Sequence, residues 1–159
     1  ASCLVLAIGL ITQDKSTLFR FVAKSALLLV FLVSLSGMLG SLAYEHVVGF
    51  APCMLCWYQR IVMYPITLIS GMAYLRNKSQ NDVLDYSLFL AGIGAAIGAW
   101  HNIEKIIGKE VVACDASGPS CLQTFVDGFG FIDIPVMSLT FFVLMILIIV
   151  TRKRFAASH

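Results

Sequence analysis

Four long apolar stretches constrain the fold of this chain more than any other feature. They lie at about Ala26 to Tyr44, Trp57 to Leu75, Tyr86 to Ile103 and Ile134 to Thr151. Each approaches the roughly 20 residues that a helix needs to cross a bilayer. Their apolar residues are continuous, whereas the strands of a membrane barrel would alternate lipid-facing and lumen-facing residues. The sequence therefore predicts an all-α integral membrane protein, a bundle of four helices.

The composition agrees with a membrane protein. Hydrophobic residues make up 59% of the 159 residues and charged residues only 13%, unlike the composition of soluble domains. No repeat, Pro-rich linker or low-complexity tract divides the chain. We expect an N-terminal extension at 1–20 with no assigned role, which holds Cys3, a four-span domain at 21–154 and a cytoplasmic tail at 155–159.

Basic residues predict the orientation of the spans. Eight of the 11 Lys and Arg residues flank the apolar stretches on one side, which marks that side as cytoplasmic: Lys15, Arg20, Lys24, Arg76, Lys78, Arg152, Lys153 and Arg154. Both termini should therefore be cytoplasmic, and the connections at 45–56 and 104–133 should face outside. Neither connection has a basic stripe with interleaved aromatic residues, so nucleic acid is not an expected partner. Membrane lipid is an expected partner because of the apolar stretches.

The first outer connection ends in a pair of cysteines. Cys53 and Cys56 follow Pro52, a residue that suits the first turn of a helix. Side chains at i and i+3 of a helix share a face at about 5–6 Å, a separation that a disulfide can bridge. The positive end of a helix also lowers the pKa of a cysteine thiol. We therefore expect a redox-active pair with stabilised thiolates.

Arg60 and His101 are candidate partners of this pair. Arg60 lies one turn beyond Cys56, and a guanidinium at mid-membrane costs roughly 2.5–3.5 kcal/mol on insertion scales. It either extends to the lipid headgroups or donates to a carbonyl oxygen of an electron acceptor such as a quinone. His101 continues the small-residue face of Gly94 and Gly98, where a helix or a flat ring can approach closely, so it should point inward. It could transfer a proton or be satisfied by a backbone carbonyl.

A second pair of cysteines, Cys114 and Cys121, flanks a turn-forming Gly118-Pro119 in the last long connection. A disulfide there would order the loop and add about 2–3 kcal/mol on the chain-entropy model. Beside another pair on the same side, it could also exchange disulfides and relay electrons. Four cysteines could alternatively hold zinc, although the wider spacing of the second pair and an oxidising location count against this.

The segment Pro-Cys-Met-Leu-Cys-Trp-Tyr-Gln-Arg at 52–60, the four predicted spans, the second outer pair and Phe-Gly-Phe-Ile-Asp-Ile-Pro at 129–135 resemble the bacterial DsbB/BdbC disulfide bond formation proteins. The similarity covers roughly 21–154, and the short spacing of the second pair is closer to the BdbC branch. It implies a thiol:quinone oxidoreductase of the bacterial cytoplasmic membrane. Such an enzyme reoxidises a thioredoxin-like partner outside the membrane and passes the electrons to a quinone, either ubiquinone or menaquinone.

The resemblance also implies roles for individual residues. Cys114 would be attacked by the thiolate of the partner, Cys121 would be its disulfide mate, and Cys53 with Cys56 would carry the electrons onward. Cys56 would face the quinone, Arg60 would contact a ring oxygen of the quinone, and His101 would lie near it.

Two other classes of function remain as alternatives. A non-catalytic membrane bundle would hold structural disulfides or a zinc site whose cysteines never change state. A small transporter is disfavoured, because no acidic residue lies deep in a predicted span.

Overall fold

The computed structural model describes residues 17–47, 49, 52–76, 80–108 and 134–157, and helices account for nearly all of them. No strand occurs within these ranges, so the all-α class is confirmed for the described residues. The helices are α2 (Thr17–Lys24), α3 (Ala26–His46), α4 (Met54–Leu75), α5 (Gln80–Ile107) and α6 (Ile134–Ala157).

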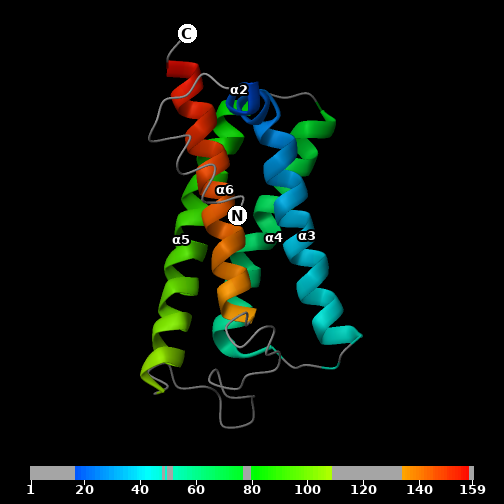
Figure 1. The fold of residues 1–159 in the computed structure, drawn as a ribbon. Coiled ribbons are helices and arrows are strands. Elements are labelled where there is room, and N and C mark those ends of the chain that lie inside the picture. Colours follow the sequence, from blue (N-terminus) through cyan, green and yellow to red (C-terminus); the bar gives the residue numbers. More distant parts are fainter. Residues whose placement is uncertain (1–16, 48, 50–51, 77–79, 109–133, 158–159) are drawn as a thin grey trace.

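The four long helices run side by side and alternate in direction (Figure 1). Helices α3 and α5 each pack against both α4 and α6, and the short α2 packs against α6 and α3. At one end of the molecule, the lower end in Figure 1, α3 and α5 finish and α4 and α6 begin. The helix ends that precede α4 and α6 in the chain therefore lie at the same end of the molecule.

Three helices are long and apolar enough to cross a membrane, namely α3, α5 and α6. The prediction of a span is therefore confirmed, by length and composition, for these three. Helix α4 has 22 residues, which is also sufficient length. It does not qualify on composition, because Gln59 and Arg60 lie in its second turn and lower its hydropathy.

The helices are longer than the predicted spans. Helix α5 extends beyond Tyr86 and Ile103 at its two ends, and α6 continues through its basic residues to Ala157. The expected tail at 155–159 thus begins inside α6, and the boundary expected at residue 20 falls inside α2. An apolar stretch in the sequence shows only which part of a helix suits lipid. The helix itself continues into the polar residues that flank this stretch.

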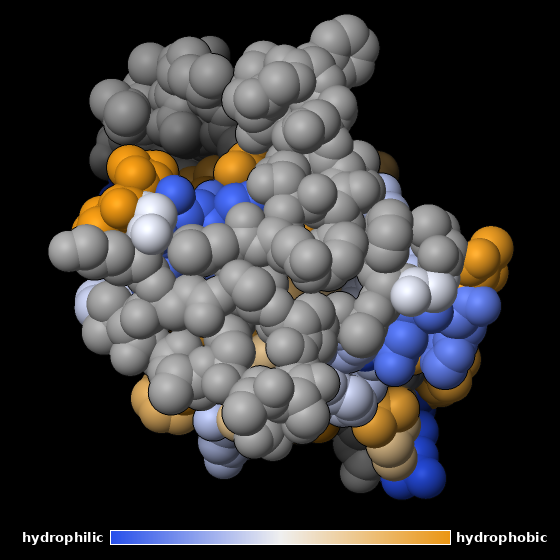
Figure 2. Space-filling model, turned by 90° about the horizontal axis from the view of Figure 1, so that it is seen from below, coloured by the Kyte–Doolittle hydropathy of each residue, from blue (hydrophilic) through white to orange (hydrophobic). Residues whose placement is uncertain are grey.

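The end at which α4 begins has a mixed surface. Seen from below, hydrophobic and hydrophilic side chains of the described residues lie beside one another around the rim (Figure 2).

Small residues on α5 allow close packing against α6. A Cβ atom at Gly94 would overlap the ring of Phe142, which is completely buried, and a Cβ at Gly98 would lie 3.4 Å from the Cα of Leu139. The close approach predicted from the Gly94 and Gly98 spacing is confirmed, and a helix with an aromatic ring occupies the space. This contact fixes α5, and with it His101, relative to α6.

Replacing Gly94 with alanine should destabilise the protein by about 1–3 kcal/mol, because the added methyl group displaces the ring of Phe142. Gly92 is the matched control, since a Cβ there meets nothing within 4 Å and alanine is the better helix former. Thermal unfolding in detergent should show a lower Tm for Gly94→Ala and an unchanged or higher Tm for Gly92→Ala. Equal Tm values would show that this packing contact is unimportant.

A candidate dithiol site at the start of α4

The two cysteines of the first pair meet at the start of α4. Cys53 is the N-cap residue, with an extended backbone (φ −71°, ψ 169°), and its carbonyl oxygen accepts a hydrogen bond from the N–H of Trp57. Cys56 lies in the first turn, and the two Sγ atoms are 2.8 Å apart, with no disulfide bond between them. Pro52 precedes the N-cap, so the prediction that it lies in the first turn was wrong by two residues. The helical spacing nevertheless brings the two sulfurs into contact.

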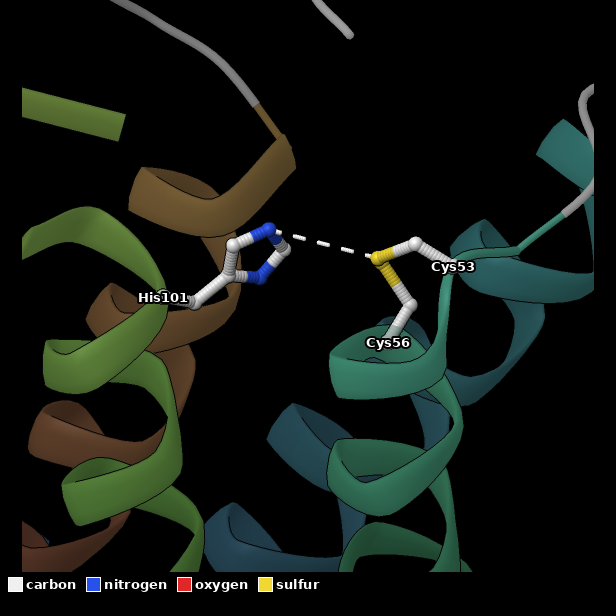
Figure 3. Close-up of side chains that lie close together, drawn as sticks. All are labelled: Cys53, Cys56 and His101. Atoms are coloured by element: carbon white, nitrogen blue, oxygen red, sulfur yellow. Dashed lines mark hydrogen bonds between the residues drawn. The ribbon is translucent and has the colours of Figure 1, made fainter. Parts of the chain in front are cut away.

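His101 lies beside this pair. It projects from α5 toward α4, and its Nε2 is 4.0 Å from the Sγ of Cys53 (Figure 3). Only 2% of His101 is exposed, so the inward orientation predicted from the small-residue face is confirmed. Because α5 runs antiparallel to α4, its last turns lie next to the first turn of α4. An imidazole is thus within reach of a reactive sulfur.

The environment of Cys53 does not stabilise a thiolate. The hydrogen bond with Cys56 and the burial of the side chain raise the pKa of Cys53 to about 12, and the contact with His101 acts in the opposite direction. The expectation that the helix end lowers the cysteine pKa was therefore wrong for Cys53. At neutral pH this residue keeps its proton, and a base is needed before its sulfur can react.

Alkylation of the reduced protein should reveal the raised pKa of Cys53. Because the thiolate is the reacting species, modification of Cys53 should rise about tenfold per pH unit from pH 7 to 10 without a plateau. At pH 8 it should be at least about a hundredfold slower than in the denatured chain. Mass spectrometry of the modified peptides gives the rates. A plateau near pH 8 or 9 for Cys53 in the folded protein would contradict the raised pKa.

Arg60 is directed toward α3. Its Nε donates to the hydroxyl of Ser41 at 2.7 Å, its Nη2 donates to the backbone carbonyl of Ser41 at 3.0 Å, and its Nη1 forms an ion pair with Glu45. The guanidinium also lies over the ring of Trp57, 5.4 Å from the ring centroid. Arg60 is 7% exposed, so it lies inside the protein and does not extend to its surface. Glu45 offsets the cost of burying the positive charge.

Sequence reasoning missed Ser41, Glu45 and Gln59. Gln59 is 5% exposed, and its Nε2 has no hydrogen-bond partner among the described residues. A Cβ at Gly98 would lie 3.5 Å from this nitrogen, so the amide lies between α4 and α5, on a different side of α4 from the Arg60 network. An acidic residue at the end of one apolar stretch and a Gln-Arg pair at the start of the next were the available signals.

Glu104 is a further buried polar residue at this end of the molecule. It is 1% exposed, and its Oε1 accepts a hydrogen bond of 2.8 Å from the indole N–H of Trp100. Its burial could not be predicted from the sequence, because Glu104 appears there as one of several charged residues after the third apolar stretch. Glu104 lies one turn beyond His101 on α5 and adds a carboxyl group to the polar end of the bundle.

The second cysteine pair, Cys114 and Cys121, lies outside the described residues, as does Cys3. In the sequence, the pair comes between the end of α5 and the beginning of α6. The roles predicted for Cys114 and Cys121 stay predictions, and so does a zinc site made of four cysteines.

Comparison with known proteins identifies the family. The family model described as "Disulfide bond formation protein DsbB" matches residues 23–152. The SPbeta prophage-derived disulfide bond formation protein B of Bacillus subtilis (strain 168) is 39% identical over 122 residues, which are 77% of this chain and 81% of that protein. Disulfide bond formation protein C of the same strain is 41% identical over 122 residues, or 76% and 87% of the two chains.

A probable disulfide formation protein of Oceanobacillus iheyensis is 40% identical over 139 residues, which are 83% of this chain and 94% of that protein. No solved structure matches the chain. With the Cys53–Cys56 pair at the start of α4 and a family model that covers most of the sequence, the chain belongs to the DsbB family of disulfide bond formation proteins, with BdbC-like relatives in Bacillus.

Proposed function

We propose that this protein is a thiol:quinone oxidoreductase of the bacterial cytoplasmic membrane, which supports disulfide bond formation in exported proteins. It would take two electrons from the dithiol of a thioredoxin-like partner and pass them to a membrane quinone, ubiquinone or menaquinone. Membership of the DsbB family supports the generation of disulfides. The observation that carries the proposal is the contact between Cys53 and Cys56, with His101 beside it and the buried Arg60 one turn away.

We also propose how the chain crosses the membrane. All four long helices would cross the membrane, both termini would be cytoplasmic, and both cysteine-containing connections would face outside, within one membrane domain at 21–154. The alternating directions of α3 to α6 support this arrangement. Basic residues near the C-terminal ends of α2, α4 and α6 also support it, because they lie at the end of the molecule away from the start of α4: Lys24, Arg76 and Arg152.

The electrons would move by two disulfide exchanges and one transfer to the acceptor. A thiolate of the partner attacks Cys114 of the Cys114–Cys121 disulfide, the partner leaves as a disulfide, and two thiols remain in the loop. These thiols reduce the Cys53–Cys56 disulfide by a second exchange. The quinone accepts two electrons and two protons from the Cys53–Cys56 dithiol, which closes again to a disulfide, so the net products are one partner disulfide and one quinol.

Residues around the pair fit an acceptor that carries carbonyl oxygens. Arg60 is a buried donor held in place by Ser41 and Glu45, and Gln59 presents a buried amide N–H group with no partner among the described residues. Donors in a site of low dielectric strongly stabilise negative charge that develops on an oxygen. Cys56, which is less buried than Cys53, would face the acceptor. His101 would take the proton of Cys53 as its sulfur enters the disulfide.

The test is quinone reduction by the purified protein in detergent, followed by absorbance, with a reduced thioredoxin-like protein as donor. We expect reduction that depends on both the donor and the enzyme, and its loss in Cys114→Ser, because the donor then has no disulfide to attack. Absence of reduction with several donors and both quinone types, in metal-free protein whose cysteines never change their oxidation state, would support a structural membrane bundle instead.

A further inference from the structure

Three potential metal ligands meet at the start of α4. The Sγ atoms of Cys53 and Cys56 and a ring nitrogen of His101 all lie within 4.8 Å of one another. In a tetrahedral zinc site, with Zn–S near 2.3 Å and Zn–N near 2.0–2.1 Å, neighbouring ligand atoms are about 3.4–3.8 Å apart. The sulfurs are now 2.8 Å apart, and Nε2 is 4.0 Å from the Sγ of Cys53. Shifts of about an ångström or less in the side chains would produce the geometry of a metal site.

The donor set selects the class of ion. Two thiolates and one imidazole suit Zn²⁺, Cd²⁺ and Cu⁺. Among the described residues, the cluster includes no carboxylate of the kind that Mg²⁺ and Ca²⁺ prefer. Three protein ligands leave a fourth position open on a tetrahedral ion.

The surrounding charges also favour a cation. Two thiolates in a buried site need neutralisation, and one divalent ion with a neutral imidazole gives a site with no net charge. Arg60 lies one turn after Cys56 along α4, and its positive charge is neutralised by its ion pair with Glu45. Its charge is thus balanced on the α3 side of α4, while the metal ligands lie between α4 and α5.

We propose that the reduced protein captures a thiophilic metal ion at Cys53, Cys56 and His101, and that capture reversibly stops turnover. The dithiol and M²⁺ give a metal dithiolate and two protons released to solvent, with no electron transfer. The disulfide form has no thiolates and does not bind the ion. Metal and electron acceptor would therefore compete for the same reduced state, and the inhibitory part of this inference rests on the proposed function. The site needs neither Cys114 nor Cys121.

The probe is Cd²⁺ added to the full-length chain in detergent, in a variant that lacks the other three cysteines (Cys3→Ser, Cys114→Ser, Cys121→Ser). After reduction and anaerobic removal of the reductant, we expect one Cd²⁺ per chain, seen by equilibrium dialysis and by the thiolate-to-metal charge-transfer absorption. The oxidised chain should bind none. His101→Ala should weaken binding by about tenfold or more, since even changes outside the ligand shell cost about 10–100-fold.

Two further variants keep the test decisive. His46→Ala is the matched control, because His46 is an exposed histidine in the last turn of α3, at the same end of the molecule, and it should bind Cd²⁺ normally. His101→Gln keeps most of the length of the side chain but offers no soft ligand, so it should weaken binding while its Tm stays near that of the parent variant, which distinguishes ligand loss from misfolding. An unchanged affinity for Cd²⁺ in His101→Ala would overturn the proposed site. So would a chain that binds Cd²⁺ only when Cys114 and Cys121 are present.

Activity is measured separately, on metal-free protein that keeps Cys114 and Cys121. Zn²⁺ should inhibit quinone reduction, and a chelator should restore it. Metal-free protein that reduces quinone but binds no Cd²⁺ would overturn the metal site alone. Protein that binds Cd²⁺ through His101 but reduces no quinone would refute the proposed enzyme and leave the metal site intact.

Discussion

Cys56→Ser should lower quinone reduction to the rate measured without protein. A serine hydroxyl cannot form a disulfide, so the dithiol can no longer deliver two electrons by closing on itself. Cys53 cannot replace it, because Cys53 is buried and a single thiol has no second cysteine with which to close a disulfide. The measurement is the steady-state rate of quinol formation with a reduced thioredoxin-like donor.

The control for this variant is Cys3→Ser, which removes a cysteine expected to have no role and should keep the full rate. Serine is close to cysteine in size, so the Tm of Cys56→Ser should stay near that of the unaltered protein. A folded Cys56→Ser protein that still turns over would contradict the proposed path of the electrons.

Arg60→Leu should lower kcat/KM for the quinone by about 10²–10³, the usual effect of removing one donor to a developing oxyanion. The change removes the positive charge near Cys56 and leaves Glu45 without its partner. Steady-state kinetics at several quinone concentrations would separate the effect on kcat from that on KM. Arg76→Leu is the matched control, because Arg76 is the exposed C-cap residue at the other end of the same helix, and it should retain the full rate.

A second variant separates catalysis from stability. Arg60→Leu/Glu45→Gln removes both charges of the ion pair, so it should recover the Tm lost in Arg60→Leu. Its kcat/KM should stay low, because the donor is still absent. Recovery of activity in the double variant would show that Arg60 acts only to stabilise the packing of α3 against α4.

The elements were more predictable than their contacts. The continuous apolar stretches located all four long helices, because a span needs many adjacent apolar residues and few polar ones. The helix ends were less predictable, since α5 and α6 continue beyond the apolar part. The orientation of His101 could be predicted because it follows Gly94 and Gly98 along one face of the same helix.

The chemistry of the site depends on side-chain burial and on contacts between helices, which could not be deduced from one helix alone. The helix end predicts a lower pKa for Cys53, but the contact with Cys56 and the burial of the side chain raise it. The pairing of Arg60 with Glu45 depends on how α3 and α4 are placed along one another. Sequence spacing within each helix holds no information about that placement.

A single-turnover reaction tests electron transfer from this dithiol to a quinone most directly. The Cys114→Ser/Cys121→Ser protein, fully reduced and free of reductant, is mixed under anaerobic conditions with excess ubiquinone or menaquinone analogue. We predict one quinol and one Cys53–Cys56 disulfide per chain, from absorbance and peptide mapping. Thiols that stay free at Cys53 and Cys56 while both quinone types stay oxidised would contradict a thiol:quinone oxidoreductase.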